Sequence, residues 1–281
     1  MAEDIYEMVT NEIIERLEKG VIPWHRPWVG DSKIMNLATK TPYNGINVFL
    51  LGCSGYSSPY WMTYKQAQKG GGYVKRGEKG VTVIFWKIYT TEDRDDPDKT
   101  TTIPVLKYYK VFNTEQMEGI EAPEEEEKTR EFNPIETCER IVKNYPDCPP
   151  IEHKKQRACF SPSLNCINMP KPETFAAPDY YYQVLFHELT HSTGHKSKLN
   201  RSNSAFNMFG DENYSKEELV AEMGGCFLSS HAGIDYDKEN SASYIAGWLR
   251  ALKQRKNKKM LITAAAQAQK STNFILGVKT K

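Results

Sequence analysis

The stretch His187-Glu188-Leu189-Thr190-His191 places two imidazoles and a carboxylate at a spacing that suits a metal ion. Residues four apart lie on the same face of an α-helix, so His187 and His191 can bind one cation together. Glu188 lies one step round the helix, where it can reach a water on that cation and take its proton. Apolar residues flank the motif and Gly194 follows it. The sequence therefore predicts a buried helix with a zinc peptidase centre, in which His187 and His191 bind metal and Glu188 is catalytic.

A catalytic zinc ion usually takes three protein ligands and one water, so one protein ligand is still needed. A metzincin would supply a histidine three residues after Gly194, but that residue is Ser197. His195 comes two residues too early, and on a continued helix it would lie one turn beyond His191. The metzincin interpretation therefore fails, and a carboxylate from a second helix is the alternative.

Glu218 and Glu222 are four residues apart and share one face of a predicted helix. Their segment resembles the glutamate helix of gluzincin-type peptidases, in which the first glutamate binds metal and the one four later orients a ligand histidine. We expect Glu218 as the third ligand and Glu222 behind a histidine, with Glu222 as the alternative ligand. Ser215 and Glu218 also fit a capping box, which would turn Glu218 back toward the helix start. His195 is expected just outside the ligands, where it or Tyr214 could steady an oxyanion.

Several elements must position these groups. The segment 157–169 includes a short strand ending at Asn168, which is the candidate edge strand for pairing with a peptide backbone. A hydrophilic hairpin loop over 91–104 joins two strong strands. The predicted helices cover 4–19, 134–145, the two motif segments, and about 241–256 and 258–275, and the two strong strands cover 81–89 and 105–112.

Glutamate-rich residues after position 115 read as a flexible acidic linker. We therefore predict an α+β protein with a small mixed domain at 1–115, a linker at 116–132 and a mainly helical domain with a short edge sheet at 133–281. The chain of 281 residues has no apolar run long enough for a membrane span, and its start lacks the basic and apolar parts of a secretion signal. These features predict a cytoplasmic protein without a membrane partner.

The six cysteines include no C-x-x-C pair, which is typical of free thiols in a reducing compartment. Four of them fall between positions 138 and 166, so a second metal site there is the alternative.

Residues 20–90 are basic and aromatic. Nine Lys and Arg side chains stand there against Asp31 and Glu78, and four of the five tryptophans lie in this stretch. Aromatic rings interleaved with cations suit single-stranded nucleic acid, because bases stack on rings while cations contact phosphates. The alternative is that the tryptophans form a core and the lysines simply face solvent.

These motifs together resemble the ArdC-type antirestriction proteins over nearly the whole chain. The resemblance rests on residues 24–28 (WHRPW), 43–47 (YNGIN), 61–67 (WMTYKQA), 75–80 (KRGEKG), 186–195 (FHELTHSTGH) and 217–222 (EELVAE). It implies a protein of plasmids and other mobile elements that protects DNA from restriction. It also implies an N-terminal domain that binds single-stranded DNA and a zincin-like C-terminal domain related to the SprT group. The stretch 94–131 looks like an insertion, and Asn165 stands where the resemblance leads us to expect an acid.

The leading hypothesis is a single-stranded DNA-binding protein with one Zn²⁺ per chain, for which Mn²⁺ or another divalent metal is the alternative. A protein substrate is expected if the metal centre is catalytic. The rival hypotheses are a DNA-binding module with a purely structural metal site, and a zinc endopeptidase with a basic accessory domain. The residues expected to contact DNA are Trp24, Trp61, Tyr64, Lys65, Lys75, Arg76 and Lys79.

Overall fold

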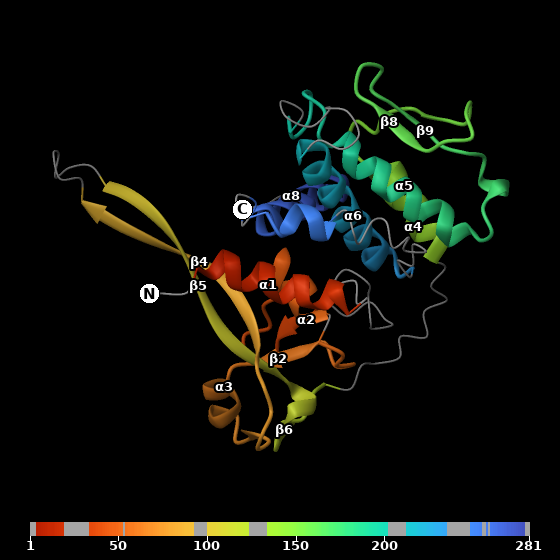
Figure 1. Cartoon of the computed structure of the whole chain (residues 1–281). Helices are drawn as coiled ribbons and strands as arrows, with labels where there is room; N and C mark the ends of the chain where they lie inside the picture. Colours follow the sequence, from red (N-terminus) through yellow and green to blue (C-terminus); the bar gives the residue numbers. More distant parts are fainter. Residues whose placement is uncertain are drawn as a thin grey trace.

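The computed structural model is a mixed α and β protein, as the sequence predicts, with most of its long helices in the second half of the chain (Figure 1). Among the residues it describes, no helix combines the length and the apolar character that crossing a membrane requires. The described residues are 4–19, 34–52, 54–92, 100–123, 134–201, 212–234, 248–254, 257 and 259–278.

The N-terminal half is organised by a four-stranded sheet with the order β1-β2-β5-β4. The pair β1–β2 is parallel, whereas β2–β5 and β5–β4 are antiparallel, and a separate antiparallel pair joins β3 to β6. The elements of this half are α1 (Ile5–Glu18), β1 (Met35–Asn36), α2 (Ile46–Gly52), β2 (Tyr60–Met62), α3 (Tyr64–Lys69), β3 (Tyr73–Val74), β4 (Val81–Glu92), β5 (Thr100–Asn113), η1 (Thr114–Gln116) and β6 (Met117–Glu118).

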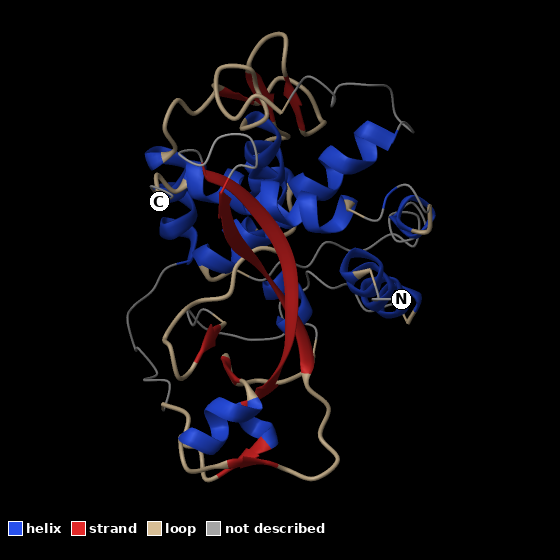
Figure 2. Ribbon diagram, turned by 90° about the vertical axis from the view of Figure 1, so that its left-hand side faces the viewer, coloured by secondary structure: helices blue, strands red, loops and turns tan. Residues whose placement is uncertain are grey.

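The predicted hairpin is present, but its strands are longer than predicted. β4 and β5 pair continuously from Val81 opposite Val111 to Glu92 opposite Thr100. Much of the stretch 91–104 is therefore strand and not loop. Figure 1 shows the two strands as one long curved ribbon whose far end leaves the rest of the molecule, and Figure 2 views this ribbon from that side, in front of the helices.

α1 confirms the helix predicted at 4–19. The side chain of Asp4 caps it by accepting a hydrogen bond from the backbone N–H of Tyr6. Val9, Ile13 and Leu17, spaced at helical period, are fully or almost fully buried. Through this apolar stripe, α1 packs into a core that it shares with helices of the second half.

The C-terminal half packs its helices together beside a small sheet. α5 and α6 lie against each other, and α8 packs on α6 (Figure 1). The part of the predicted 241–256 helix that the structure describes is helical at 248–252. The elements of this half are α4 (Pro134–Asn144), β7 (Ile151–Glu152), β8 (Cys159–Ser161), β9 (Cys166–Asn168), η2 (Pro172–Thr174), α5 (Pro178–Ser192), α6 (Glu212–Ala232) and α8 (Met260–Ile275).

The small sheet corrects the predicted edge strand. Its order is β7-β9-β8, so the strand that ends at Asn168 is the central strand and cannot be the free edge. β8 is an outer strand and packs against α5. Asn165 also lies outside the strands, in the β8–β9 turn, with a φ of 45°. Asparagine tolerates this left-handed conformation better than most residues, which explains its presence there.

One hydrophobic core joins the two halves of the chain. It includes Phe49 of α2 and Leu106 of β5 together with Met223 and Phe227 of α6. The rings of Phe49 and Phe227 stack with centroids 4.8 Å apart. A second core lies wholly within the C-terminal half, between α4, α5 and the sheet. The two halves are therefore packed against each other through apolar side chains.

The beginning of the predicted linker belongs to the N-terminal half. Gln116 and Met117 are buried, and Met117 pairs with Val74 in the β3–β6 ladder. The Gln116 amide donates hydrogen bonds to Glu78 and to the carbonyl of Lys79. Residues 124–132 of the predicted linker lie outside the described residues.

Candidate metal centre

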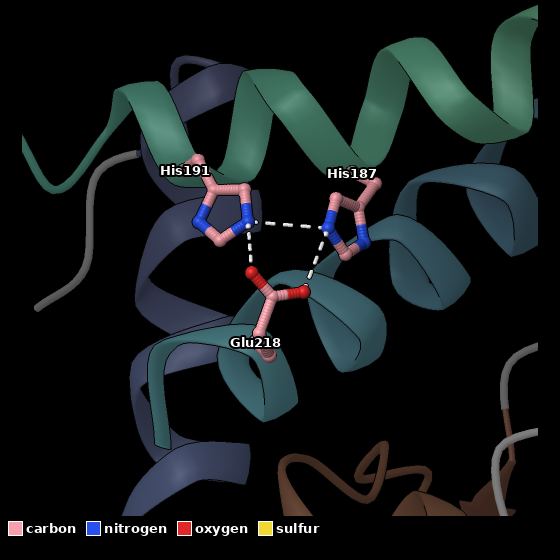
Figure 3. A group of neighbouring side chains, drawn as sticks. All are labelled: His187, His191 and Glu218. Atoms are coloured by element: carbon pink, nitrogen blue, oxygen red, sulfur yellow. Dashed lines mark hydrogen bonds and ion pairs between the residues drawn. The ribbon is translucent and has the colours of Figure 1, made fainter. Parts of the chain in front are cut away.

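Three side chains from two helices converge on one point. His187 and His191 lie one turn apart on α5, and Glu218 reaches them from α6, as Figure 3 shows. The Nε2 atoms of the two histidines are 3.1 Å apart. The two carboxylate oxygens of Glu218 lie 3.5 Å from Nε2 of His187 and 3.4 Å from Nε2 of His191.

These separations fit a metal ion. Ligands at about 2.0–2.1 Å from a tetrahedral zinc ion are about 3.4 Å from one another, close to the values found here. One ligand atom from each of the three residues lies within 4.8 Å of the others. Within the described residues this is the single group of His, Cys, Asp or Glu side chains that converges so closely. Five of the six cysteines are described, all with free thiols, and they form no such group.

A close approach of α5 and α6 makes this geometry possible. Gly224 of α6 faces Thr190 of α5, and a Cβ at Gly224 would lie only 2.6 Å from the Thr190 hydroxyl oxygen. Any larger residue at that point would force the Thr190 side chain to shift. Glycine lets the two backbones approach closely, so the carboxylate of Glu218 can reach the imidazoles of α5.

Each histidine also contacts a second carboxylate through its Nδ1 atom. Nδ1 of His187 lies 3.3 Å from the Glu222 carboxylate, as expected for an orienting partner. Nδ1 of His191 lies 3.5 Å from the carboxylate of Glu217. Glu217 is in turn bound by Arg201 at 2.8 Å. Both rings therefore direct Nε2 toward Glu218.

The arrangement shifts the ionisation of its members. Burial alone would lower the pKa of His191, but hydrogen bonds with Glu217 and Glu218 outweigh it and raise that pKa to about 10. Burial would likewise raise the pKa of Glu218, yet its bonds with His187 and His191 hold that pKa far below its usual range. Without metal, the cluster therefore holds ionised carboxylates around a proton on His191.

Glu188 lies between α5 and the small sheet. Its side chain is buried, and its Oε2 accepts a hydrogen bond of 2.7 Å from the backbone N–H of Phe160. Because this N–H of β8 binds Glu188, it faces away from β9 and toward α5. Glu188 is thus fixed at the free edge of β8, next to the two histidines of its own helix.

The two halves of the chain match two described protein families. Residues 3–112 match the family described as the N-terminal domain of anti-restriction factor ArdC. Residues 137–267 match the family described as a zincin-like metallopeptidase. The chain is also similar to the metal-free crystal structure of the antirestriction ArdC protein from the R388 plasmid. The sequence identity is 35%, the TM-score is 0.76, and the match covers 97% of this chain and 96% of that one. The chain belongs to the ArdC family.

Further relatives agree with this membership. The Mn(II)-bound structure of the R388 ArdC protein has 34% identity and a TM-score of 0.77, covering 98% of both chains. The Sinorhizobium fredii protein y4eC is 31% identical, with 97% of this chain and 91% of that protein covered. The chain is also 34% identical to an Escherichia coli protein named DNA primase TraC. That match covers 98% of this chain and 27% of TraC, so the chain spans about a quarter of that relative.

His195 follows the end of α5 at Ser192 and lies beside β8. Its Nδ1 lies 2.7 Å from the Ser197 hydroxyl, and its ring meets the edge of Phe160 at 6.5 Å. The expected role of His195 beside the ligands stays a prediction. The side chain of Tyr214 lies outside the described residues.

The sequence prediction missed Glu217 and Arg201. Glu217 stands directly before the expected ligand Glu218, and adjacent helix residues point in different directions, so the spacing gave no reason to choose it. Arg201 comes from outside both motif helices. Its guanidinium bonds Thr193, Ser271 and the carbonyl of Thr190 as well as Glu217. This network connects α5, α6 and α8 around the histidine.

The ArdC-type N-terminal half presents some of the residues expected to contact DNA. Tyr64 and Lys65 project from α3 and are exposed. Lys75, Arg76 and Lys79 are also exposed, in the turn after β3. Trp24 lies outside the described residues.

The burial of Trp61 contradicts the prediction that its ring contacts DNA. Trp61 is 1% exposed and packs in a core with Leu51, Val83 and Val111, so its ring is not a platform for a base in this structure. Much of the 61–67 motif has a structural purpose. Thr63 and Gln66 form a capping box at the start of α3. Most of the 61–67 motif is thus explained by buried apolar residues and a helix cap, and these roles require no ligand.

Proposed function

We propose that this chain is an antirestriction protein that binds single-stranded DNA and carries a divalent-metal peptidase centre. The observation that carries the peptidase part is the convergence of His187, His191 and Glu218 beside the buried carboxylate of Glu188. Membership of the ArdC family supports the antirestriction part. The basic, aromatic composition of the N-terminal half supports single-stranded DNA as the nucleic acid.

His187, His191 and Glu218 would hold the metal, with zinc as our proposal and manganese as the alternative that the Mn(II)-bound relative supports. A divalent cation there supplies positive charge that polarises a substrate carbonyl and acidifies water. Glu217 and Glu222 fix the tautomers and orientations of the two imidazoles. Glu188 accepts the proton of the attacking water and gives it to the leaving amine.

The free edge of β8 supplies the place for a peptide. An extended chain can add to this edge as a further strand, held by main-chain hydrogen bonds. The N–H of Phe160 already points out of the sheet and is bound by Glu188. A peptide that pairs with β8 would therefore pass directly over the catalytic carboxylate, which places its scissile carbonyl near the three ligands.

The test compares Glu188→Gln with Glu218→Ala. We expect Glu188→Gln to retain about one metal ion per chain and to lose cleavage of fluorescently labelled casein, because the amide cannot accept the proton. Glu218→Ala should lose metal and cleavage together. Metal content is measured by mass spectrometry, and cleavage is followed with and without a single-stranded oligonucleotide. Cleavage by Glu188→Gln at the wild-type rate would exclude the proposed role of this residue.

The DNA-binding part is tested separately by titrating a labelled single-stranded oligonucleotide at several salt concentrations. Contacts to phosphates should make the affinity fall steeply as salt rises. Absence of binding at low salt would leave a metallopeptidase with a basic accessory half. Binding without any cleavage by the wild type would instead favour a DNA-binding module whose metal site is structural.

A further inference from the structure

The outer part of the β4–β5 ribbon exposes large apolar side chains on both of its faces. Up to Ile84 the residues of β4 are mostly buried, but from Phe85 to Thr90 they face solvent. Trp86 is 51% exposed, Ile88 67% and Tyr108 46%. Figure 1 shows the outer end of this ribbon extending away from the helices. We call residues 85–90 with 102–108 the shaft of the ribbon.

The register shows how the shaft is built. Directly paired residues share a face, so Trp86, Ile88 and Tyr108 lie on one face. Phe85, Lys87 and Tyr89 lie on the other, where Lys107 is paired with Phe85. Ile84 and Leu106 on the Trp86 face belong to the core shared with α1 and α2, so helices cover part of that face, whereas Phe85, Lys87 and Tyr89 on the other face are exposed. Exposed apolar surface of this size, gathered on one element, marks a binding surface more often than it serves stability.

The charge of the shaft indicates what it binds. Lys87, Lys107 and the neighbouring Lys110 are exposed, and no acidic residue occurs at 81–91 or at 101–112. Nζ of Lys87 lies 4.9 Å from the centre of the Tyr89 ring, so a cation and a ring are already side by side. The acids of the hairpin begin at Glu92 and continue to Asp98. The basic aromatic surface is therefore limited to the shaft and does not extend to these acidic residues.

We propose that the shaft is the surface on which single-stranded DNA lies, with bases stacked on Phe85 and Tyr89 and phosphates contacted by Lys87 and Lys107, which share one face of the ribbon. Stacking on exposed rings requires bases whose faces are free, which single strands offer and duplexes do not. A second copy of the chain fits less well, because pairing two shafts would bring lysines against lysines. This inference rests on the proposed DNA-binding function and gives it a location that the buried ring of Trp61 cannot supply.

The experiment measures binding of a labelled 30-nucleotide single strand by the full-length protein and by two shaft variants. Phe85→Ala/Tyr89→Ala should weaken binding at least about tenfold, since each base–ring stack contributes substantially to affinity. Lys87→Ala/Lys107→Ala should reduce the slope of log affinity against log salt by about 0.7 for each phosphate contact that is lost. Lys171→Ala/Tyr180→Ala, which changes an exposed lysine and an exposed ring in the C-terminal half, is the matched control and should have the smaller effect.

The outcomes separate this inference from the function it rests on. If the wild type does not bind the strand, the DNA-binding function itself fails. If the wild type binds and both shaft variants bind equally well, the shaft is not the DNA surface. A change of oligomeric state in those variants, seen by light scattering, would then assign the shaft to self-association. Lys87→Glu/Lys107→Glu, which alters only exposed side chains, repeats the test if the ring variant fails to fold, and it should abolish binding.

Discussion

The two candidate ligand histidines are oriented by different partners. Glu222 stands behind His187, whereas His191 is backed by Glu217 and, through it, by Arg201. The Arg201 side chain is 8% exposed, so removing Glu217 would leave a largely buried cation without its carboxylate. A change at Glu222 leaves the Arg201–Glu217 pair in place, so it tests the orientation of His187 without breaking that pair.

We predict that Glu222→Ala weakens metal binding about 10–100-fold, because an orienting carboxylate behind a ligand histidine typically contributes that much to affinity. The affinity is measured by competition with a fluorescent chelator. Glu173→Ala, which removes an exposed carboxylate from η2, is the control and should leave the affinity unchanged. An unchanged affinity in Glu222→Ala would show that His187 does not depend on this partner.

The pKa of His191 gives a prediction on pH. A metal ligand must be a neutral imidazole, yet Glu217 and Glu218 raise the pKa of His191 to about 10 in the metal-free protein. At pH 7 this ring carries a proton that metal must displace. We expect close to one proton to be released from His191 on metal binding, and the affinity to rise as pH increases up to about 10. Calorimetry in two buffers of different ionisation enthalpy measures the release, and equal heats in both would contradict it.

Individual site residues could be predicted from the sequence where their positions follow from helical spacing. His187, Glu188 and His191 are set by one turn of one helix, and Glu218 with Glu222 by one turn of another. The structure brings these groups together as predicted, although metal binding itself stays a prediction. His195 and Glu217 could not be assigned, since their positions depend on where α5 ends and on how α6 is rotated against it.

At the scale of elements, the contact between α5 and α6 sets the distance across the site. Glycine within a helix costs about 1 kcal/mol relative to alanine, so Gly224 would normally be a place to gain stability. Here a methyl group would collide with the Thr190 side chain, whose hydroxyl oxygen would lie 2.6 Å from it. In a Gly224→Ala variant, the collision would lower the stability of the protein, whereas the better helix propensity of alanine would raise it. The larger of these two effects decides whether the variant is less or more stable.

We predict that Gly224→Ala destabilises the protein by about 1–3 kcal/mol, because overpacking a tight helix contact typically costs more than the propensity gain. It should also weaken metal binding, since the helices must separate. Thr190→Ala/Gly224→Ala, which removes the colliding atoms, should recover most of the stability. Urea unfolding measures both, and a Gly224→Ala variant as stable as the wild type would show that the helices adjust without cost.

Long elements with a regular apolar pattern were predictable, whereas short ones were not. α1 and the β4–β5 hairpin follow from their periodicity, and the structure confirms both. The three-residue strands β8 and β9 carry too few residues to show a pattern, so the edge was assigned to the wrong strand. Trp61 was expected at a surface because composition reports how many rings a region holds and not which way each one points.

At the scale of the whole molecule, α6 connects the two halves. One side of this helix carries Glu217, Glu218 and Glu222 toward α5. Leu219, Met223 and Phe227 belong to the core that also contains residues of α1, α2, β4 and β5. The acidic stretch suggests two independent domains, but the shared core could not be read from it. The N-terminal half is thus part of the support for the helix that supplies the third candidate ligand.

This arrangement predicts that a substitution in the N-terminal half disturbs the metal centre. Phe49 of α2 is buried against Phe227, so Phe49→Ala should lower the free energy of unfolding by about 3–5 kcal/mol. Because Phe227 is on α6, metal should be released over the same range of urea concentration in which tryptophan fluorescence changes. Ile88→Ala removes an apolar side chain that is 67% exposed on the ribbon, and its effect should stay within about 0.5 kcal/mol. Retention of metal by Phe49→Ala after the fluorescence transition would show that the C-terminal half holds its ligands without support from α2.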